Sequence, residues 1–279
     1  MTLISPARVP VTAGTWRWGE GQQFFVEADR LVRTPIATSR RVGVLSLVGG
    51  AGASSVAAGV AMLSARRRSS PVLAVDAAGA QYGLGHQLGH RGVDTVTNVE
   101  TLAADPQSFA EASFPLARSG SLHYLGLGHP HSASWPADSR EWHASVAPIG
   151  RFFPVVITDW GRRRDLHAIA DISRASHSVC LIAPADRTGL EQVAALVPAL
   201  RHEPASPDVV VVLVDRSGDG AGASRIHLGN LDAPVLRVGF DSALSQGSAP
   251  RRRTRAALLQ VAAVLIGGTV QAADVGVIR

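Results

Sequence analysis

The stretch that decides the fold is VGVLSLVGGAGASS, residues 42–55. An apolar run, residues 42–48, enters a glycine-rich turn, and small polar residues typical of a helix start follow it. Glycines allow the backbone to wrap closely with its N–H groups turned inward, and a helix N-terminus adds partial positive charge. A second apolar run, ending at Asp76, follows the predicted helix. The order of strand, glycine turn, helix and strand predicts a loop of the kind that binds phosphate groups.

The chain around this stretch alternates short apolar runs with longer amphipathic segments. This alternation is typical of a parallel sheet that helices cover on both faces. The expected strands are residues 42–48, 72–77, 122–127, 155–159, 178–183, 209–215 and 235–240. The expected helices are residues 54–67, 107–118, 165–175, 189–201 and 254–266. We therefore predict an α/β fold with a doubly wound, mainly parallel sheet of seven or eight strands flanked by helices.

The predicted α/β domain covers residues 40–267, between an N-terminal arm, residues 1–39, and a C-terminal tail, residues 268–279. The arm shows little periodicity but carries aromatic side chains that include Trp16 and Trp18. Two interpretations of the arm stay open at this stage. It packs on its own domain, or it docks a protein partner through those tryptophans.

The composition excludes several classes of chemistry. All 27 lysine and arginine residues are arginine, so a Schiff base, a lysine general base and a phosphate-clamping ammonium are excluded. The single cysteine, Cys180, lies in an apolar run and is expected to be an inert core residue. The net charge of +5 favours acidic partners. No segment resembles a signal peptide or a membrane span, so we expect a cytoplasmic, soluble protein.

Residues 41–267 resemble the ParA/MinD family of P-loop ATPases. The loop of that family reads Lys-Gly-Gly-x-Gly-Lys-[Ser/Thr], and residues 48–54 read VGGAGAS. VLAVDAAG, residues 72–79, resembles the Asp-x-Asp segment of the family, and VVITDWG, residues 155–161, resembles its switch II strand. The resemblance implies a P-loop NTPase fold and a site for ATP and magnesium. The implied nucleotide-site residues are Gly49, Gly50, Gly52, Ala53, Ser54, Ser55, Asp76, Asp159 and Asp215.

Three positions depart from the family pattern. Val48 and Ala53 stand where the resemblance implies the two loop lysines, and Ala78 stands where it implies the water-positioning aspartate. A drift in composition from lysine to arginine does not explain these residues, because none of the three is arginine. Charge-assisted hydrogen bonds contribute about 1.5–3 kcal/mol each, so losing both lysines weakens triphosphate binding by roughly 10²–10⁴-fold.

The substitutions predict a pseudo-ATPase with a vestigial nucleotide site. Phosphoryl transfer depends on positioning and charge neutralisation, so no catalytic residue, resident cofactor or metal is assigned. Ser54, Asp76 and Asp159 keep the residue types that organise magnesium in the family. Weak, passive binding of a nucleotide stays open.

An arginine triplet, Arg162, Arg163 and Arg164, follows the switch II-like strand at the start of an expected helix. Positive charge is unfavourable at a helix N-terminus, so an acidic partner would relieve the conflict. We therefore predict that the triplet docks a partner. The alternatives are that it is simply solvated, or that one guanidinium approaches the vacated phosphate region.

The leading functional hypothesis is a non-hydrolysing scaffold or regulator that associates with a protein partner in a larger cellular machine. The family serves machines for secretion, division, partition and pilus assembly, and RVGVLSL, residues 41–47, is most similar to ParA-like proteins of type VII secretion. A homodimer is compatible with the resemblance. Two alternatives stay open: a slow ATPase completed by arginine or a partner residue, and an arginine-driven module that binds DNA or membrane surfaces, which is less favoured.

Overall fold

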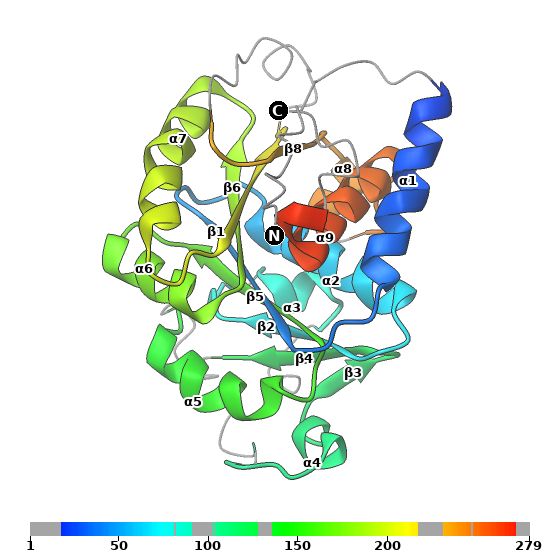
Figure 1. The fold of residues 1–279 in the computed structure, drawn as a ribbon, viewed down its shortest axis with the longest axis vertical. Helices are drawn as coiled ribbons and strands as arrows, with labels where there is room; N and C mark the ends of the chain where they lie inside the picture. Colours follow the sequence, from blue (N-terminus) through cyan, green and yellow to red (C-terminus); the bar gives the residue numbers. More distant parts are fainter. Residues whose placement is uncertain are drawn as a thin grey trace, which may run out of the picture.

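The computed structural model describes residues 18–80, 82–90, 102, 104–127, 136–216, 231–246 and 248–271. Its strands are β1 (Arg40–Ser46), β2 (Val72–Asp76), β3 (Ala117–Ser119), β4 (Leu122–Gly126), β5 (Val155–Arg162), β6 (Ser178–Pro184), β7 (Asp208–Val214) and β8 (Val235–Val238). They form an eight-stranded sheet in the order β3-β4-β2-β5-β1-β6-β7-β8 (Figure 1). Only the β3–β4 pair is antiparallel among these strands. The prediction of a doubly wound, mainly parallel sheet is confirmed.

Helices cover both faces of this sheet (Figure 1). They are α1 (Trp18–Arg33), α2 (Ala53–Arg67), α3 (Leu84–Gln87), α4 (Phe109–Ser113), α5 (Ser139–Gly150), α6 (Leu166–Ala175), α7 (Arg187–His202), α8 (Ser242–Ser245) and α9 (Arg252–Gln271). Successive strand residues point to opposite faces, and β2 follows this rule. Val72 and Ala74 belong to the core shared with α1, α2 and α9, whereas Leu73 and Val75 belong to the core shared with α5, α6 and α7.

The structure corrects the helix expected over residues 107–118. Helix α4 ends at Ser113, because Pro115 has no backbone N–H to continue the helical hydrogen bonds. The chain then turns into β3, and Gly120, with φ of +60°, makes the hairpin to β4. This short antiparallel edge strand is the element that brings the sheet to eight strands.

Helix α5 is absent from the expected elements although the sequence carries its start signal. The Asp138 carboxylate accepts a hydrogen bond of 2.8 Å from the Glu141 amide, which caps the first turn. Trp142, Val146 and Ile149 follow at helical spacing and are buried. The cap and this spacing together are the signal that identifies the helix.

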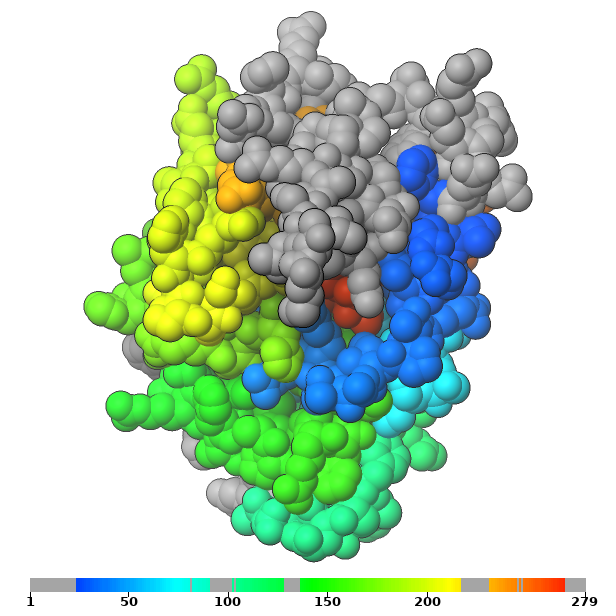
Figure 2. All heavy atoms as spheres, viewed as in Figure 1, coloured from blue at the N-terminus to red at the C-terminus, as the bar shows by residue number. Residues whose placement is uncertain are grey.

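The part of the arm that the structure describes is helix α1, which packs along α9 and α2 (Figure 1) and lies on the face of the molecule drawn in Figure 2. Ala28, Leu31 and Val32 of α1 are buried in the same core as β1. Asp29 also accepts hydrogen bonds of 2.6 Å from Arg33 and from Arg67 of α2. This segment therefore packs on the α/β domain. Trp16 and the side chain of Trp18 lie outside the described residues, so their docking role stays a prediction.

Helix α9 runs through the interior of the domain. Seven of its side chains form an almost fully buried stripe against α1, α2 and the sheet: Leu258, Leu259, Val261, Ala262, Ala263, Val264 and Leu265. An adsorbing helix would need its apolar face free, so this packing argues against α9 as a membrane-surface helix. Over the residues that the structure describes, no helix has the length and apolarity to cross a membrane.

Two valines on α1 test whether the helix is part of the folded unit. Val32 is fully buried and Val26 is 61% exposed. Val32→Ala is expected to lower the free energy of unfolding by about 2 kcal/mol, because it removes two buried methyl groups and leaves a cavity. Val26→Ala, the matched control, is expected to change it by less than about 0.5 kcal/mol. Urea denaturation measures both, and equal effects would show that α1 does not contribute to the cooperative core.

Candidate functional site

The turn between β1 and α2 has the backbone form of a phosphate-binding loop. The Ser46 hydroxyl donates a hydrogen bond of 2.9 Å to the Val48 carbonyl and closes the start of the turn. Gly50 and Gly52 have φ of +70° and +96°, the left-handed region that favours glycine. Gly52 is also the N-cap of α2, and its carbonyl accepts a hydrogen bond of 2.9 Å from the Val56 amide. The sequence prediction of a glycine turn leading directly into a helix is confirmed.

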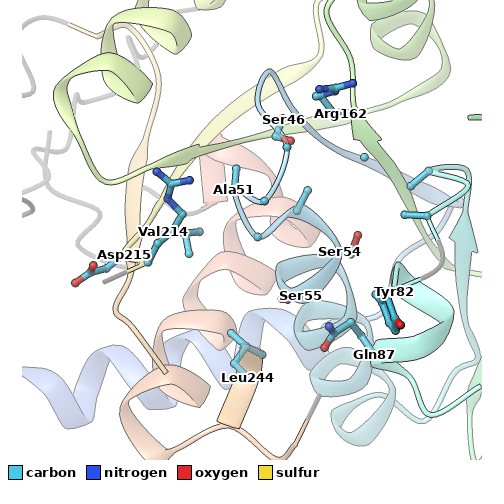
Figure 3. Close-up of a pocket in the computed structure, with 18 of the residues that line it drawn as sticks. Ser46, Ala51, Ser54, Ser55, Tyr82, Gln87, Arg162, Val214, Asp215 and Leu244 are labelled. Atoms are coloured by element: carbon cyan, nitrogen blue, oxygen red, sulfur yellow. The ribbon is translucent and has the colours of Figure 1, made fainter. Parts of the chain in front are cut away.

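A cavity of about 750 Å³ opens over this loop at the carboxyl ends of the strands (Figure 3). That edge is where ligands bind in open α/β sheets. The lining includes these residues of the predicted site: Gly49, Gly50, Gly52, Ala53, Ser54, Ser55, Ala78, Arg162 and Asp215. Figure 3 shows Arg162 beside the turn that carries Ser46, with Tyr82 and Gln87 on the other side of the loop.

The cavity also has an apolar lining that sequence reasoning missed. Tyr82 is 69% exposed, Phe240 is 44% exposed, and both line the opening together with Leu244. Phe240 follows β8 by two residues, so its position at a strand end is the signal that could have identified it. Arg216, two residues after β7, lines the same side and lies 3.6 Å from the Asp186 carboxylate. The site therefore offers more apolar surface than the loop alone suggests.

The three substituted positions bring no charge to the cavity. Val48 is half-buried and packs against the core that α1, α2 and α9 share. Ala53 is 8% exposed at the start of α2 and presents only a methyl group. The Ala78 amide donates a hydrogen bond of 3.1 Å to Asp76, while its methyl group lies against the backbone of Gly161.

Two carboxyl groups, Asp76 and Asp159, lie side by side beneath the loop. The parallel pairing of β2 with β5 places the two residues directly opposite each other. Asp159 is fully buried and Asp76 is 7% exposed. Asp76 accepts hydrogen bonds from the amides of Ala78 and Gly85, at 3.1 and 3.2 Å. Asp159 Oδ1 accepts from the Gly161 amide at 2.9 Å, but its Oδ2 is buried with no hydrogen-bond partner.

This environment raises the pKa of both carboxyl groups. Burial, followed by repulsion from Asp76, raises the pKa of Asp159 from 3.8 to about 7, while the Ser54 hydroxyl, the Gly161 amide and Arg163 oppose the shift. Burial also raises the pKa of Asp76, against the hydrogen bonds from backbone amides. Burial therefore disfavours the ionised form of both carboxyl groups.

The strand β5 continues beyond Asp159, whereas the sequence predicts that it ends there. Val44 pairs with Asp159 and Leu45 with Gly161, so Trp160 is an extra residue that forms a bulge. Gly161 has φ of +63°, and a Cβ at this position would lie 2.7 Å from the Cβ of Ala78. The bulge therefore needs glycine at residue 161 for both conformation and space.

The structure separates the three arginines of the triplet, which sequence reasoning treats as one surface. Arg163 is buried, and its guanidinium donates hydrogen bonds of 3.1 and 2.8 Å to the carbonyls of Ala77 and Ala137. It is not available to a partner, which corrects the docking prediction for this residue. Arg162 and Arg164 are exposed, and both precede the N-cap of α6, Asp165, rather than lying within its first turn.

The residues present fit only part of a nucleotide and magnesium site. The Ser54 hydroxyl and the two buried carboxyls are oxygen donors of the kind magnesium takes. The backbone cradle fits phosphate, but no side chain of the loop supplies the cation that neutralises a triphosphate. Elsewhere among the described residues, no group of three His, Cys, Asp or Glu side chains is placed to hold a metal ion.

Solved structures with this architecture include proteins described as ParA family and MinD ATPases. Cell division ATPase MinD from Pyrococcus furiosus aligns with a TM-score of 0.61 and 18% identity, over 82% of this chain and 98% of that protein. A ParA family ATPase from Chlorobium tepidum aligns with a TM-score of 0.55 and 19% identity, over 80% and 97%. The chain has the fold of the ParA and MinD ATPases. No protein-family model matches its sequence, and no curated protein matches it significantly.

The MinD of Aquifex aeolicus, solved in a complex with MinC, has the same fold. It aligns with a TM-score of 0.58 and 14% identity, over 85% of this chain and 94% of that one. The alignments cover nearly all of the solved chains, so the likeness extends over the whole fold of those proteins. Sequence identities below one fifth establish the fold alone. The activity of this chain therefore has to be inferred from its own residues.

Asp159→Asn tests the electrostatics of the carboxyl pair. Folded Asp159 keeps its proton up to about pH 7, whereas the unfolded chain releases it near pH 4, so wild-type stability should fall between these values. Asp159→Asn has no carboxyl group at this position, so its free energy of unfolding should not fall over this pH range. At pH 8 the variant should be more stable than the wild type by about 1–4 kcal/mol, and this difference should shrink toward pH 4.

Urea denaturation at several pH values between 4 and 8 measures this difference. Asp138→Asn is the matched control, because Asp138 is an exposed N-cap at which asparagine caps equally well. A stability gain of Asp159→Asn that does not depend on pH would contradict the raised pKa.

Proposed function

We propose that this chain is a non-hydrolysing ParA/MinD-like protein that acts through protein–protein association. The observation that carries the proposal is a well-formed phosphate cradle whose positions 48, 53 and 78 present no charge, above a buried carboxyl pair. Triphosphate binding needs cations to offset the phosphate charges. Here Ala53 presents only a methyl group at the start of α2, and ionisation of the buried carboxyl pair would repel the phosphate charges further.

The chemistry of the loop also argues against nucleotide-driven dimerisation. For a nucleotide to drive dimerisation, the side chain at position 48 would have to extend out of the loop and contact a second subunit. Val48 is apolar and packs against the core on the α2 side of the sheet. The chain therefore keeps the architecture of a nucleotide switch without the side chain that couples nucleotide to a partner subunit. A homodimer, where it forms, would need another driving force.

Partner association is supported by what the fold does elsewhere. The Aquifex MinD was solved with MinC bound, which is a protein complex built on the same architecture. In this chain, Arg162 and Arg164 are exposed beside the cavity, so an acidic segment of a partner is the ligand we propose for them. The machine served, including the type VII secretion branch, stays a prediction from residues 41–47.

Calorimetry with ATP and magnesium tests the proposed loss of the site. The wild type is expected to bind weakly, whereas a Val48→Lys/Ala53→Lys/Ala78→Asp variant is expected to bind about 10²-fold or more tightly, because two charge-assisted contacts return. Phosphate release measured alongside should stay at background for the wild type.

A control variant separates the site from a general gain in charge. Ser69 and Ser70 follow α2 at the opposite end of the helix from the loop. Ser69→Lys/Ser70→Lys/Ala78→Asp therefore adds the same net charge without restoring the loop. Equal and tight binding of ATP by the wild type and the loop variant would refute the loss of the nucleotide site. Phosphate release by the wild type above background would refute the non-hydrolysing proposal.

A slow ATPase completed by arginine is the second candidate, and one contact favours it. Arg162 lines the cavity, and its Cδ lies 3.9 Å from the position of a Cβ on Gly49. A guanidinium there can approach a phosphate without any change in the fold of the loop. Turnover that Arg162→Gln abolishes, while Arg164→Gln leaves it unchanged, would favour this candidate over the first.

The DNA- or membrane-surface alternative rests on exposed charge. Arg251, Arg252 and Arg253 are all exposed where α9 begins. Binding of this kind falls steeply with salt, so duplex DNA and anionic vesicles at two salt concentrations test it. Absence of binding to both at low salt would eliminate this alternative.

A further inference from the structure

A second cavity, of about 230 Å³, lies at the entry end of β1, where the strand follows the segment of residues 34–39. Figure 1 shows β1 running from that segment toward the glycine-rich turn, so the two cavities lie at opposite ends of the strand. A seven-residue strand spans roughly 20 Å, which keeps this cavity apart from the loop. Its polar side chains come from Thr38, Ser39, Arg41 and Arg151, with His177 before β6 and Trp142 of α5.

Arg41 and His177 turn hydrogen-bond donors toward each other at this cavity. The Arg41 amide donates a hydrogen bond of 3.0 Å to His177 Nδ1, so the proton of the neutral ring resides on Nε2. Arg41 Nη2 lies 3.4 Å from that same Nε2. Burial, and then the charge of Arg41, lower the pKa of His177, so the ring stays neutral. Two N–H groups therefore converge with no acceptor between them.

Two more polar atoms in the same place have no partner. Arg41 Nε and Ser39 Oγ are buried, and neither makes a hydrogen bond within the part of the chain that the structure describes. A buried donor without a partner costs about 1–3 kcal/mol, so such atoms call for a bound acceptor. No carboxylate is among the residues that line the cavity.

The neighbouring arginine shows how this chain satisfies a guanidinium when it serves structure alone. Arg40 lies 2.6 Å from the Asp208 carboxylate, and it also donates to the Ser178 hydroxyl and to the Leu265 carbonyl. Arg151, at the rim of the cavity, is held by Asp105 and by the Pro106 carbonyl. Arg41 differs from both, because its guanidinium faces a cavity and another donor.

We propose that this cavity is a binding site for a small oxyanion, a phosphate or a carboxylate, held by Arg41, His177 and Ser39. An oxyanion accepts several hydrogen bonds at once and offsets the guanidinium charge, which a single neutral water cannot do. The cavity has room for such a group. The inference does not depend on the proposed function, because none of these residues contributes to the glycine loop.

The test is a titration of the full chain with inorganic phosphate, followed by ¹⁵N-edited NMR of the arginine Nε–H and histidine ring signals. We expect saturable shifts of the Arg41 Nε–H and His177 signals. Sodium chloride at matched ionic strength should not reproduce them. A parallel titration with acetate identifies the class of anion. Saturable shifts with acetate would indicate a carboxylate, and shifts with phosphate alone would indicate a phosphate.

Variants locate the site and separate it from the glycine loop. Arg41→Met is expected to weaken phosphate binding by about tenfold or more, because it removes a charge-assisted contact. Ser54→Ala/Ser55→Ala in the loop and Arg140→Met, an exposed arginine on α5, are the controls and should leave the Arg41 and His177 shifts unchanged. Should Arg41→Met fail to fold, Ser39→Ala and the wild-type titration carry the same test.

The stability of the anion-free protein gives an independent readout. Arg41→Met should not lower the melting temperature in phosphate-free buffer, because the guanidinium is unsatisfied there, and phosphate should raise the melting temperature of the wild type alone. Shifts that chloride reproduces, or shifts that Arg41→Met retains, would overturn the proposal. So would a large loss of stability of Arg41→Met without phosphate, since the side chain would then serve the fold.

Discussion

The register between β2 and β5 places one carboxyl group, Asp76, directly opposite another, Asp159, and the site is arranged around that pair. Two acids in the interior cost free energy unless charge or hydrogen bonds offset them. Backbone amides of Ala78, Gly85 and Gly161 supply hydrogen bonds, and the remaining cost of burial raises the pKa of both carboxyl groups. The fold thus accommodates the pair without any cation from the glycine loop.

The segment that follows Asp159 is fastened by Arg163 rather than left free to move. The Arg163 amide donates to the Ser46 carbonyl at 2.9 Å, at the end of β1. Its guanidinium donates to the Ala77 carbonyl, just beyond β2, and lies 5.7 Å from the centre of the Trp160 ring. One residue therefore ties together the ends of three adjacent strands.

The sequence predicts the sheet well because its strands are buried on both faces and read as continuous apolar runs. It predicts α4 and β3 poorly, since Pro115 acts locally and interrupts the long-range pattern. Helix α5 is absent from the expected helices, although the Asp138 cap and the spacing of its buried residues carry the signal. The loop geometry follows from its glycines. The burial of Arg163 could not be predicted from the sequence, because three consecutive arginines give no sign of which one is buried. The bulge at Trp160 determines which of the three side chains points into the protein.

In this chain, which has no lysine, some arginine side chains are buried where backbone carbonyls accept their hydrogen bonds. Arg68 is buried and donates to the carbonyls of Val32 and Thr34, and Arg163 does the same beside the site. Guanidinium groups are therefore compatible with the interior of this fold when acceptors surround them. The neutral residues at positions 48 and 53 are consequently a property of the loop, not of the composition. A cradle that could carry arginine and carries valine and alanine is suited to shape and backbone contacts rather than to the charge of a triphosphate.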